Sequence, residues 1–324
     1  MNGQGMKLIG LEEHFSTPDY INEFKTKDDD EFTMAGIQNM CDLGAHRIGQ
    51  MDEAGMAVQI VSFSTPGVEQ LGKDDAVRVS ADVNEYMSKA VRENPDRIQA
   101  FMTLPMASPP DAVESLQRAK EMLFAGVSIN GRIGDKYLDD PSFLPVLKGI
   151  EALDMPVYLH PCRPPKAVID AWYEGPWPDQ VTDFFSRGAW GWHIETCVHV
   201  LRIIFSGVFD QCPGLKLVIG HLGEGLPFFF QRIMKLMPAE RTLLDRSILD
   251  YLNENVYYAT SGLNYHAVFN CLKEQVSMDH ILFSTDYPFC SMKESVEFFN
   301  QLPLSESDKR KIAYENAERI FHLK

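Results

Sequence analysis

Positive charge is scarce in this sequence of 324 residues. It contains 30 lysines and arginines against 46 aspartates and glutamates, which gives a formal net charge of −16. An excess of negative charge repels phosphate backbones and anionic lipid surfaces, so binding to nucleic acids or to membrane surfaces is not expected. The remaining composition, with 45% hydrophobic and 23% charged residues, is that of a globular protein and argues against disorder.

Long apolar runs and closely spaced cysteines are also missing. No segment offers the roughly 20 uninterrupted apolar residues of a transmembrane helix, and residues 1–7 lack the basic and apolar regions of a signal peptide. The six cysteines are scattered, without the paired spacing of a zinc knuckle or a redox dithiol. We therefore expect reduced, mostly buried thiols in a cytoplasmic protein.

Short apolar runs alternate with amphipathic segments along the whole chain. The runs are continuous, as in strands that are buried on both faces. The predicted strands cover residues 7–14, 57–65, 98–106, 126–132, 156–161, 216–223, 255–262 and 281–289. Helical periodicity is clearest over 74–94, 111–124 and 191–206.

Eight such strand–helix units, with no break in composition between them, predict one fold. We expect an α/β protein with a single domain over residues 1–324, built as a (β/α)8 TIM barrel. An open, doubly wound sheet is the alternative architecture. It is less favoured because no glycine-rich turn follows the first predicted strand.

One connection is unusually long for a barrel. About 30 residues separate the fifth predicted strand from the next convincing helix, near Gly191, where a few residues are usual. All four tryptophans fall in or just after this stretch: Trp172, Trp177, Trp190 and Trp192. We expect a long aromatic loop after strand five, over residues 163–190. It would either act as a lid or subunit contact or pack against the barrel wall.

Carboxylates and imidazoles gather where the predicted strands end, which is where a barrel places its catalytic residues. The residues at these ends are Glu12, Glu13, His14, His160, His221 and Asp286. Residues two apart on a strand share a face, so Glu12 and His14 point together and Glu13 points away. A mixed nitrogen and oxygen set suits Zn²⁺, Mn²⁺ or Fe²⁺ and leaves a coordination position open. The candidate metal ligands are Glu12, His14, His160 and Asp286.

The segment 221–227 predicts a strand end followed by a turn and a helix start. Glu224 would lie in the first helical turn, close enough to His221 to accept a hydrogen bond and fix its tautomer. Such a pair beside a metal is suited to proton transfer. Glu195 and His199 lie on a helix away from the strand ends, and we interpret them as structural. The remaining histidines, His193 among them, are given no role.

These motifs resemble those of the amidohydrolase superfamily. They are Glu-Glu-His-Phe at 12–15, Tyr-Leu-His-Pro at 158–161, Gly-His-Leu-Gly-Glu-Gly-Leu-Pro at 220–227 and Leu-Phe-Ser-Thr-Asp-Tyr-Pro-Phe at 282–289. More narrowly, they are similar to those of its metal-dependent aromatic decarboxylases, which act on γ-resorcylate, 2,3-dihydroxybenzoate, 5-carboxyvanillate or aminocarboxymuconate semialdehyde. The resemblance covers nearly the whole chain. It implies a small aromatic carboxylate as substrate and assembly into homodimers or homotetramers.

The resemblance also implies roles for individual residues. One divalent ion, Zn²⁺ or Mn²⁺, would be held by Glu12, His14, His160 and Asp286. The catalytic histidine would be His221, oriented by Glu224. The positions that contact substrate would be Arg232, Asn130 and Arg47. Phe289 departs from the pattern, because one relative carries a tyrosine there.

The end of the fourth predicted strand distinguishes between reaction types. Two-metal hydrolases of the superfamily carry a carboxylated lysine there, whereas this strand ends in Asn130, with no lysine before Lys136. One ion and decarboxylation of a hydroxybenzoate-like acid are therefore favoured, with the ring protonated by Asp286 or by the His221–Glu224 pair. Two alternatives remain open: a mononuclear hydrolase (a lactonase or amidase), in which His221 activates water, and an inactive metal-binding scaffold.

Overall fold

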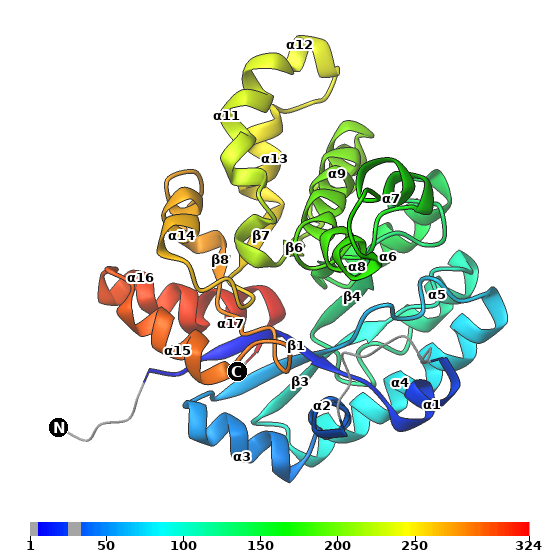
Figure 1. The fold of residues 1–324 in the computed structure, drawn as a ribbon, viewed down its shortest axis with the longest axis vertical. Coiled ribbons are helices and arrows are strands. Elements are labelled where there is room, and N and C mark those ends of the chain that lie inside the picture. Colours follow the sequence, from blue (N-terminus) through cyan, green and yellow to red (C-terminus); the bar gives the residue numbers. More distant parts are fainter. Residues whose placement is uncertain (1–5, 25–33, 324) are drawn as a thin grey trace.

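Eight parallel strands follow one another around a barrel in chain order, so the predicted (β/α)8 fold is confirmed (Figure 1). The computed structural model describes residues 6–24 and 34–323. The strands are β1 (Ile9–Phe15), β2 (Val58–Phe63), β3 (Ile98–Thr103), β4 (Gly126–Asn130), β5 (Val157–His160), β6 (Leu217–Ile219), β7 (Val256–Ala259) and β8 (Ile281–Leu282). Residues 1–5, which entered the argument against a signal peptide, lie outside the described residues. Within the described ranges, no helix combines the length and the apolar character needed to cross a membrane.

The barrel closes between its last and first strands through the segment that follows β8. Glu13 and Tyr287 form an isolated parallel bridge, and the amide of His14 donates to the carbonyl oxygen of Tyr287 at 2.6 Å. The amide of Glu12 donates to the hydroxyl oxygen of Ser284 at 2.8 Å. The segment after β8 therefore fixes the position of β1.

Helices cover the outside of the strands (Figure 1). They are α1 (Pro18–Phe24), α2 (Met34–Cys41), α3 (Ala45–Ala54), α4 (Lys73–Glu93), α5 (Pro109–Leu116), α6 (Leu144–Ala152), α7 (Lys166–Trp172), α8 (Asp179–Ser186), α9 (Gly191–Phe205), α10 (Val208–Gln211), α11 (Leu226–Leu236), α12 (Ala239–Thr242), α13 (Ile248–Glu254), α14 (His266–Lys273), α15 (Met292–Gln301), α16 (Glu306–Arg310) and α17 (Asn316–Phe321). On α4, the buried residues Ala76, Val79, Val83 and Met87 recur at three- and four-residue spacing. This spacing gives the helix one apolar face, which packs against the strands.

Apolar side chains also fill the interior of the barrel. Leu11, Ile60 and Phe101 belong to this inner cluster and are fully buried. The ring of Phe101 stacks on Tyr158 with centroids 5.6 Å apart and meets the edge of Phe321 from α17 at 5.4 Å. The polar residues at the C-terminal rim therefore rest on an apolar floor, in a region of low dielectric constant.

Two predicted elements end much earlier than expected, by seven and eight residues. The predicted strand 281–289 ends at Leu282, because the chain leaves the extended conformation and Asp286 adopts a positive φ of 62°. The predicted helix 111–124 begins at Pro109 and ends at Leu116. Leu123, with a φ of 64°, lies in the left-handed region and cannot continue a helix.

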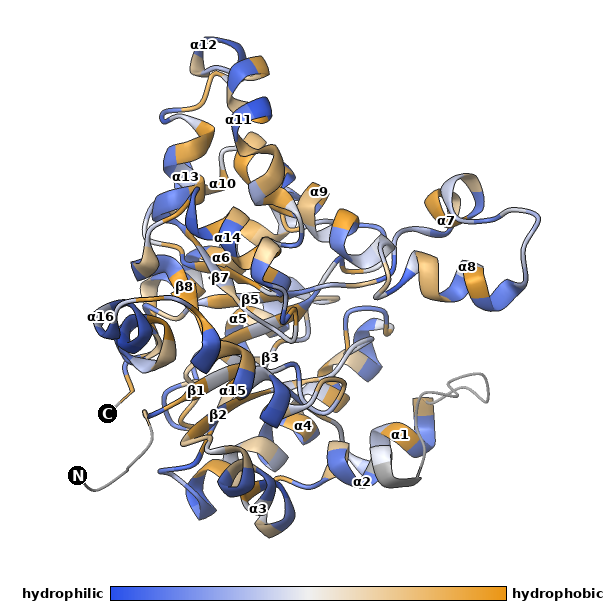
Figure 2. Cartoon of the chain, turned by 60° about the vertical axis from the view of Figure 1, so that its left-hand side comes forward, coloured by the Kyte–Doolittle hydropathy of each residue, from blue (hydrophilic) through white to orange (hydrophobic). Residues whose placement is uncertain are grey.

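The long connection predicted after strand five is present, and it contains helical segments that the sequence did not predict. Residues 163–190 contain two short helices, α7 and α8, which project away from the barrel (Figure 2). Tyr173 is buried and contacts the ring of Phe185 edge-on, with centroids 4.8 Å apart. Trp172, by contrast, is 62% exposed and does not pack against the barrel wall. We call residues 163–190 the aromatic excursion.

Candidate active site

Three imidazoles and two carboxylates from four strand ends meet at the C-terminal rim. The Nε2 atoms of His14, His160 and His221 lie 3.9, 3.4 and 3.8 Å from Oε1 of Glu12. Asp286 faces the same volume, with Oδ1 3.2 Å from Nε2 of His14 and Oδ2 3.8 Å from Nε2 of His221. This convergence was expected from the positions of the residues at the strand ends, and the structure brings all five residues together.

Each imidazole is oriented by a contact at its other nitrogen. Nδ1 of His14 lies 3.4 Å from the hydroxyl of Ser62, and Nδ1 of His160 lies 2.8 Å from the next residue's carbonyl oxygen. Nδ1 of His221 lies 2.8 Å from Oε1 of Glu224. When Nδ1 of His14 and of His160 donates, Nε2 of each ring presents a lone pair to the centre of the site, which is the tautomer that a metal ligand requires.

The centre of this cluster contains buried polar atoms that the protein itself does not satisfy. Both carboxylate oxygens of Glu12 and Nε2 of His14 have no hydrogen-bond partner among the described residues. Buried polar atoms rarely remain unpaired in native proteins. Glu12, His14 and His160 form one three-ligand group, and Glu12, His221 and Asp286 form another. An N/O donor set with unpaired oxygens fits a divalent cation such as Mn²⁺ or Zn²⁺.

Burial and neighbouring charges shift the pKa values of the ionisable groups in the site, some upward and some downward. Burial raises the pKa of Glu12 and lowers the pKa of His160 to about 3. Burial opposes ionisation of Asp286 too, but the nearby imidazoles of His14 and His221 outweigh it and lower the Asp286 pKa to about 2. Burial likewise opposes a charge on His221, but the neighbouring carboxylates of Glu224 and Glu12 raise its pKa well above the ordinary value.

The backbone after β6 is unusual around His221 and Glu224, the hydrogen-bonded pair that we call the dyad. His221, Leu222 and Glu224 have φ values of 47°, 54° and 59°, and Gly223 and Gly225 have φ values of 88° and 100°. Non-glycine residues rarely adopt this left-handed region, and consecutive ones are found where a functional geometry requires it. The bend brings the carboxylate of Glu224 back beneath the imidazole of His221.

Gly220 allows β6 and β1 to approach each other closely at the same point. A Cβ atom at this position would overlap Oε2 of Glu12 and lie 3.0 Å from the hydroxyl oxygen of Tyr158. No other residue therefore fits here without displacing Glu12.

The other carboxylate of β1 lies outside the metal cluster, as predicted. Glu13 is buried, accepts hydrogen bonds from the amide and hydroxyl of Thr285 and from Gln59, and has its pKa raised to about 8 by burial. It connects β1 to the segment after β8 and does not face the other ligands.

The position of Arg47 differs from the one that the resemblance implied. Its side chain is completely buried. The guanidinium donates to the carbonyl oxygens of His14 (2.7 Å), Asn39 (3.0 Å) and Asp42 (2.8 Å) and to Oε1 of Gln59. A group with these partners is not accessible to a substrate, so Arg47 supports the backbone of His14 from behind the site.

Asn130 ends β4 and is hydrogen-bonded to the buried carboxylate of Glu69. Its backbone N–H donates to Oε1 of Glu69 at 2.9 Å, and its side-chain Nδ2 donates to the carbonyl oxygen of Phe63 at 3.2 Å. Its Oδ1 is buried and has no partner in the described part of the chain. Burial raises the pKa of Glu69 to about 7. The polar side chain expected at this strand end is therefore present and has one acceptor atom free.

Arg232 lies on α11 and is exposed. It forms no hydrogen bond or ion pair within the described ranges. The structure thus leaves its guanidinium available but does not bring it into contact with the metal cluster.

Two aromatic rings border the cluster. The ring of Phe289 lies 5.4 Å from that of His14 and is tilted by 59°. The ring of Trp192, at the start of α9, lies 6.1 Å from that of His160. Together they form two walls that could flank a flat ring.

One residue of the site was not expected from the sequence. His193 was given no role, yet its Nδ1 is hydrogen-bonded to Oε2 of Glu224. The two residues are 31 positions apart and meet only because α9 packs beside the turn after β6. No local spacing predicts this contact. Glu195 and His199, in contrast, bind the hydroxyl of Tyr137 and the amide of Leu138, so their structural interpretation is confirmed.

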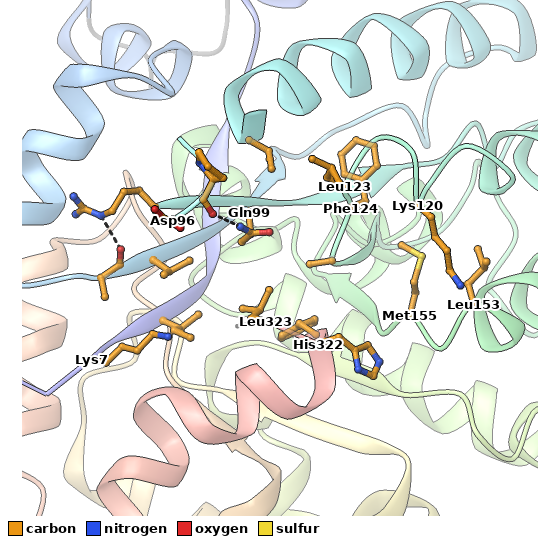
Figure 3. Close-up of a pocket in the computed structure, with 18 residues that line it drawn as sticks. Lys7, Asp96, Gln99, Lys120, Leu123, Phe124, Leu153, Met155, His322 and Leu323 are labelled. Atoms are coloured by element: carbon orange, nitrogen blue, oxygen red, sulfur yellow. Dashed lines mark hydrogen bonds between the residues drawn. The ribbon is translucent and has the colours of Figure 1, made fainter. Parts of the chain in front are cut away.

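A separate cavity of about 890 Å³ lies at the opposite end of the barrel (Figure 3). It is lined by Ile9 and Val58, the first residues of β1 and β2, and by His322 and Leu323. In TIM barrels the catalytic residues lie at the C-terminal ends of the strands. This cavity is therefore not part of the candidate active site.

Comparisons with known proteins agree with this geometry. A family model described as Amidohydrolase matches residues 41–323. γ-Resorcylate decarboxylase of Rhizobium sp. (strain MTP-10005) is 34% identical over 97% of this chain and 98% of its own length. A structure of 2,6-dihydroxybenzoate decarboxylase complexed with 2,6-dihydroxybenzoate has a TM-score of 0.90 and 30% identity, and covers 98% of this chain and 100% of that one. A dihydroxybenzoic acid decarboxylase from Polaromonas sp. JS666, with bound manganese and 2-nitroresorcinol, has a TM-score of 0.90 and 31% identity over 98% of both chains.

Proposed function

This chain belongs to the amidohydrolase family, in its branch of metal-dependent aromatic decarboxylases, and we propose that it removes CO₂ from a hydroxybenzoate-like acid. The observation that carries the proposal is the convergence of three Nε2 atoms and two carboxylates around buried oxygens without partners. The three relatives described above, each 30% or more identical along nearly their whole length, are decarboxylases of dihydroxybenzoates.

We assign one divalent ion to the cluster, with ligands Glu12, His14, His160 and Asp286. Manganese is bound in the Polaromonas relative, and Zn²⁺ suits the same donors. Such an ion would fix a phenolic oxygen and a carboxylate oxygen of the substrate and stabilise negative charge on them.

The remaining residues of the site position the substrate. Phe289 and Trp192 would flank the aromatic ring, because their own rings border the ligands on the sides of His14 and His160. Arg232 has a free guanidinium that would attract the anionic carboxylate, and Oδ1 of Asn130 is free to accept from a hydroxyl.

The reaction requires a proton at the ring carbon that bears the carboxylate. His221 would deliver it from Nε2, with Glu224 holding Nδ1, and Asp286 is the alternative donor. The new C–H bond interrupts the aromatic system. The C–C bond to the carboxylate then breaks, its electron pair restores the aromatic ring, and CO₂ leaves.

A CO₂-release screen tests this proposal directly. Protein reconstituted with Mn²⁺ or Zn²⁺ is offered a panel of hydroxybenzoates, and CO₂ and the decarboxylated phenol are quantified. Lactone and amide substrates in a parallel assay test the mononuclear hydrolase. Hydrolysis without CO₂ release would contradict the proposal, as would inactivity towards the whole panel.

We further propose a single ion per chain, a cytoplasmic location and association of copies into a homodimer or homotetramer. The exposed aromatic side chains of the excursion, Trp172 and Phe184, support association through this surface. Elemental analysis and the mass in solution test the first and the last of these statements.

A further inference from the structure

His193 lies in the first turn of α9 and places both of its ring nitrogens against oxygen atoms. Nδ1 is hydrogen-bonded to Oε2 of Glu224. Nε2 lies 2.9 Å from the carbonyl oxygen of Gly188, at the end of the aromatic excursion. Carboxylate and carbonyl oxygens only accept hydrogen bonds, so His193 is the donor in its contact with the Glu224 carboxylate.

Glu224 is thus shared between two imidazoles. Oε1 accepts from Nδ1 of His221 and Oε2 accepts from Nδ1 of His193. The two rings lie with centroids 5.0 Å apart and planes at 73°. The carboxylate is almost completely buried, so an oxygen deprived of its donor would have no water to replace it.

We propose that His193 is a positioning residue, which acts on His221 through Glu224. By binding Oε2, it fixes the carboxylate rotamer in which Oε1 faces His221, and this keeps Nε2 of His221 directed at the centre of the site. Because Nε2 of His193 binds Gly188, the same residue connects the aromatic excursion to the catalytic dyad. The inference rests on the proposed function for its catalytic consequence, but not for its geometry.

Two substitutions separate the contacts of His193. The amide nitrogen of asparagine can occupy the place of Nδ1, so His193→Asn keeps a donor to Glu224 and loses Gly188. The longer glutamine places its amide near Nε2, so His193→Gln keeps Gly188 and loses Glu224. His193→Ala loses both, and His266→Gln, exposed on α14, is the matched control.

We expect His193→Gln and His193→Ala to lower kcat by about 10- to 100-fold, the range found when partners of metal-site residues are removed. KM should change much less than kcat, because no contact to substrate is lost. His193→Asn should restore most of the kcat that His193→Ala loses. The proposal is overturned if His193→Gln keeps the wild-type kcat, or if His193→Asn is as impaired as His193→Gln.

A second readout does not depend on turnover. In ¹⁵N-histidine NMR spectra of the zinc-loaded protein, the Nδ1 proton of His221 should give a strongly downfield signal. We expect it in wild type, His193→Asn and His266→Gln, and its loss in His193→Gln; an unchanged signal in His193→Gln would overturn the positioning role. If wild type releases no CO₂ from any hydroxybenzoate, the proposed function fails, while this spectral comparison still decides the role of His193.

Discussion

At the scale of single residues, His221 differs from the other imidazoles of the site in the group that holds its Nδ1 atom. A carboxylate holds it, whereas a hydroxyl and a carbonyl oxygen contact His14 and His160. Despite burial, carboxylates raise the pKa of His221, while burial lowers the pKa of His160 to about 3. At neutral pH, His221 therefore carries a proton to transfer, and His160 presents a lone pair.

This difference predicts that His221→Ala abolishes decarboxylation but keeps the metal. We expect kcat to fall by about 10²- to 10⁴-fold, the usual contribution of a positioned proton donor. Elemental analysis should find the wild-type metal content. Normal turnover with full metal content would exclude His221 as the donor.

Substitution of a candidate ligand, unlike His221→Ala, should change the metal content. We expect Glu12→Gln or Asp286→Asn to lower the bound metal, because each removes a carboxylate from the cluster. If the metal content of both variants equals that of wild type, the ligand assignment is wrong.

A buried histidine away from the site makes stability depend on pH. Burial lowers the pKa of His199 to about 3, and its Nε2 accepts from the amide of Leu138. Below about pH 6.5 the unfolded chain binds a proton that the folded chain refuses, so folding free energy is lost as the pH falls towards 3, by about 1.4 kcal/mol per pH unit.

His199→Gln should remove this dependence. Glutamine can still accept from Leu138 but does not titrate. In urea unfolding at pH 7 and pH 5, we expect the wild type to lose about 2 kcal/mol more than the variant. Equal losses in the two proteins would contradict the assignment.

At the scale of elements, the junction between β6 and α11 determines the geometry of the dyad. Its left-handed residues bend the chain so that Glu224 faces His221, and Gly220 lets β6 pass beside Glu12. We expect Gly220→Ala to reduce metal content and activity together, because the added methyl group displaces the Glu12 carboxylate.

A second substitution, Gly225→Ala, distinguishes the effect of backbone strain from the effect of steric overlap. Nothing lies within 4 Å of a Cβ at Gly225, but its φ of 100° disfavours any side chain. We expect Gly225→Ala to lower the unfolding temperature and Gly220→Ala to lower metal occupancy as well. Full metal occupancy in Gly220→Ala would contradict the packing argument.

The sequence predicts these elements unevenly, for physical reasons. Buried parallel strands are continuous apolar runs, so all eight were located. Seven of their eight C-terminal boundaries were placed too late, because most of the residues that follow are also buried although the chain has left the extended conformation there, as the positive φ of Asp286 shows. The helices α7 and α8 were missed because seven- and eight-residue helices are short and rely on tertiary contacts such as Tyr173–Phe185.

At the scale of the whole molecule, the net charge of −16 opposes the approach of an anionic substrate. The exposed guanidinium of Arg232 and a bound cation would counter this field locally. We expect Arg232→Met to raise KM for a hydroxybenzoate by about tenfold, equivalent to one charge-assisted contact, with a smaller change in kcat. Steady-state kinetics measure this KM, and an unchanged value would show that Arg232 does not contact the substrate.

Metal binding should also contribute to the stability of the whole barrel. A cation held by the unpaired oxygens of Glu12 would bind the folded state only, and binding to that state alone stabilises it by about 2.7 kcal/mol at a hundredfold excess over Kd. We expect a chelator to lower the Tm by several degrees, and Mn²⁺ to restore it. Glu12→Gln should be insensitive to the chelator. A Tm unaffected by the chelator in the wild type would contradict the metal site.

The residues at the centre of the site were easier to predict than the residues that position them. Residues at strand ends share one rim whatever the details of the fold, so the ligands and His221 could be located from spacing and motifs. Arg47 and His193 could not be placed correctly, because their partners depend on how helices α3 and α9 pack. The orientation of a helix is a tertiary property that a local pattern does not encode.

The closure of the barrel has a consequence for biosynthesis. Glu12 contacts Ser284 across 272 residues of chain, and Asp286 follows two positions later. At about 5–20 residues per second, the ribosome takes roughly 14 to 54 seconds to bridge this interval. During that time a nascent chain carries the first two candidate ligands without the last, so the complete set exists only after Asp286 has been synthesised. A metal ion that needs all four candidate ligands would therefore bind only after Asp286 has left the ribosome.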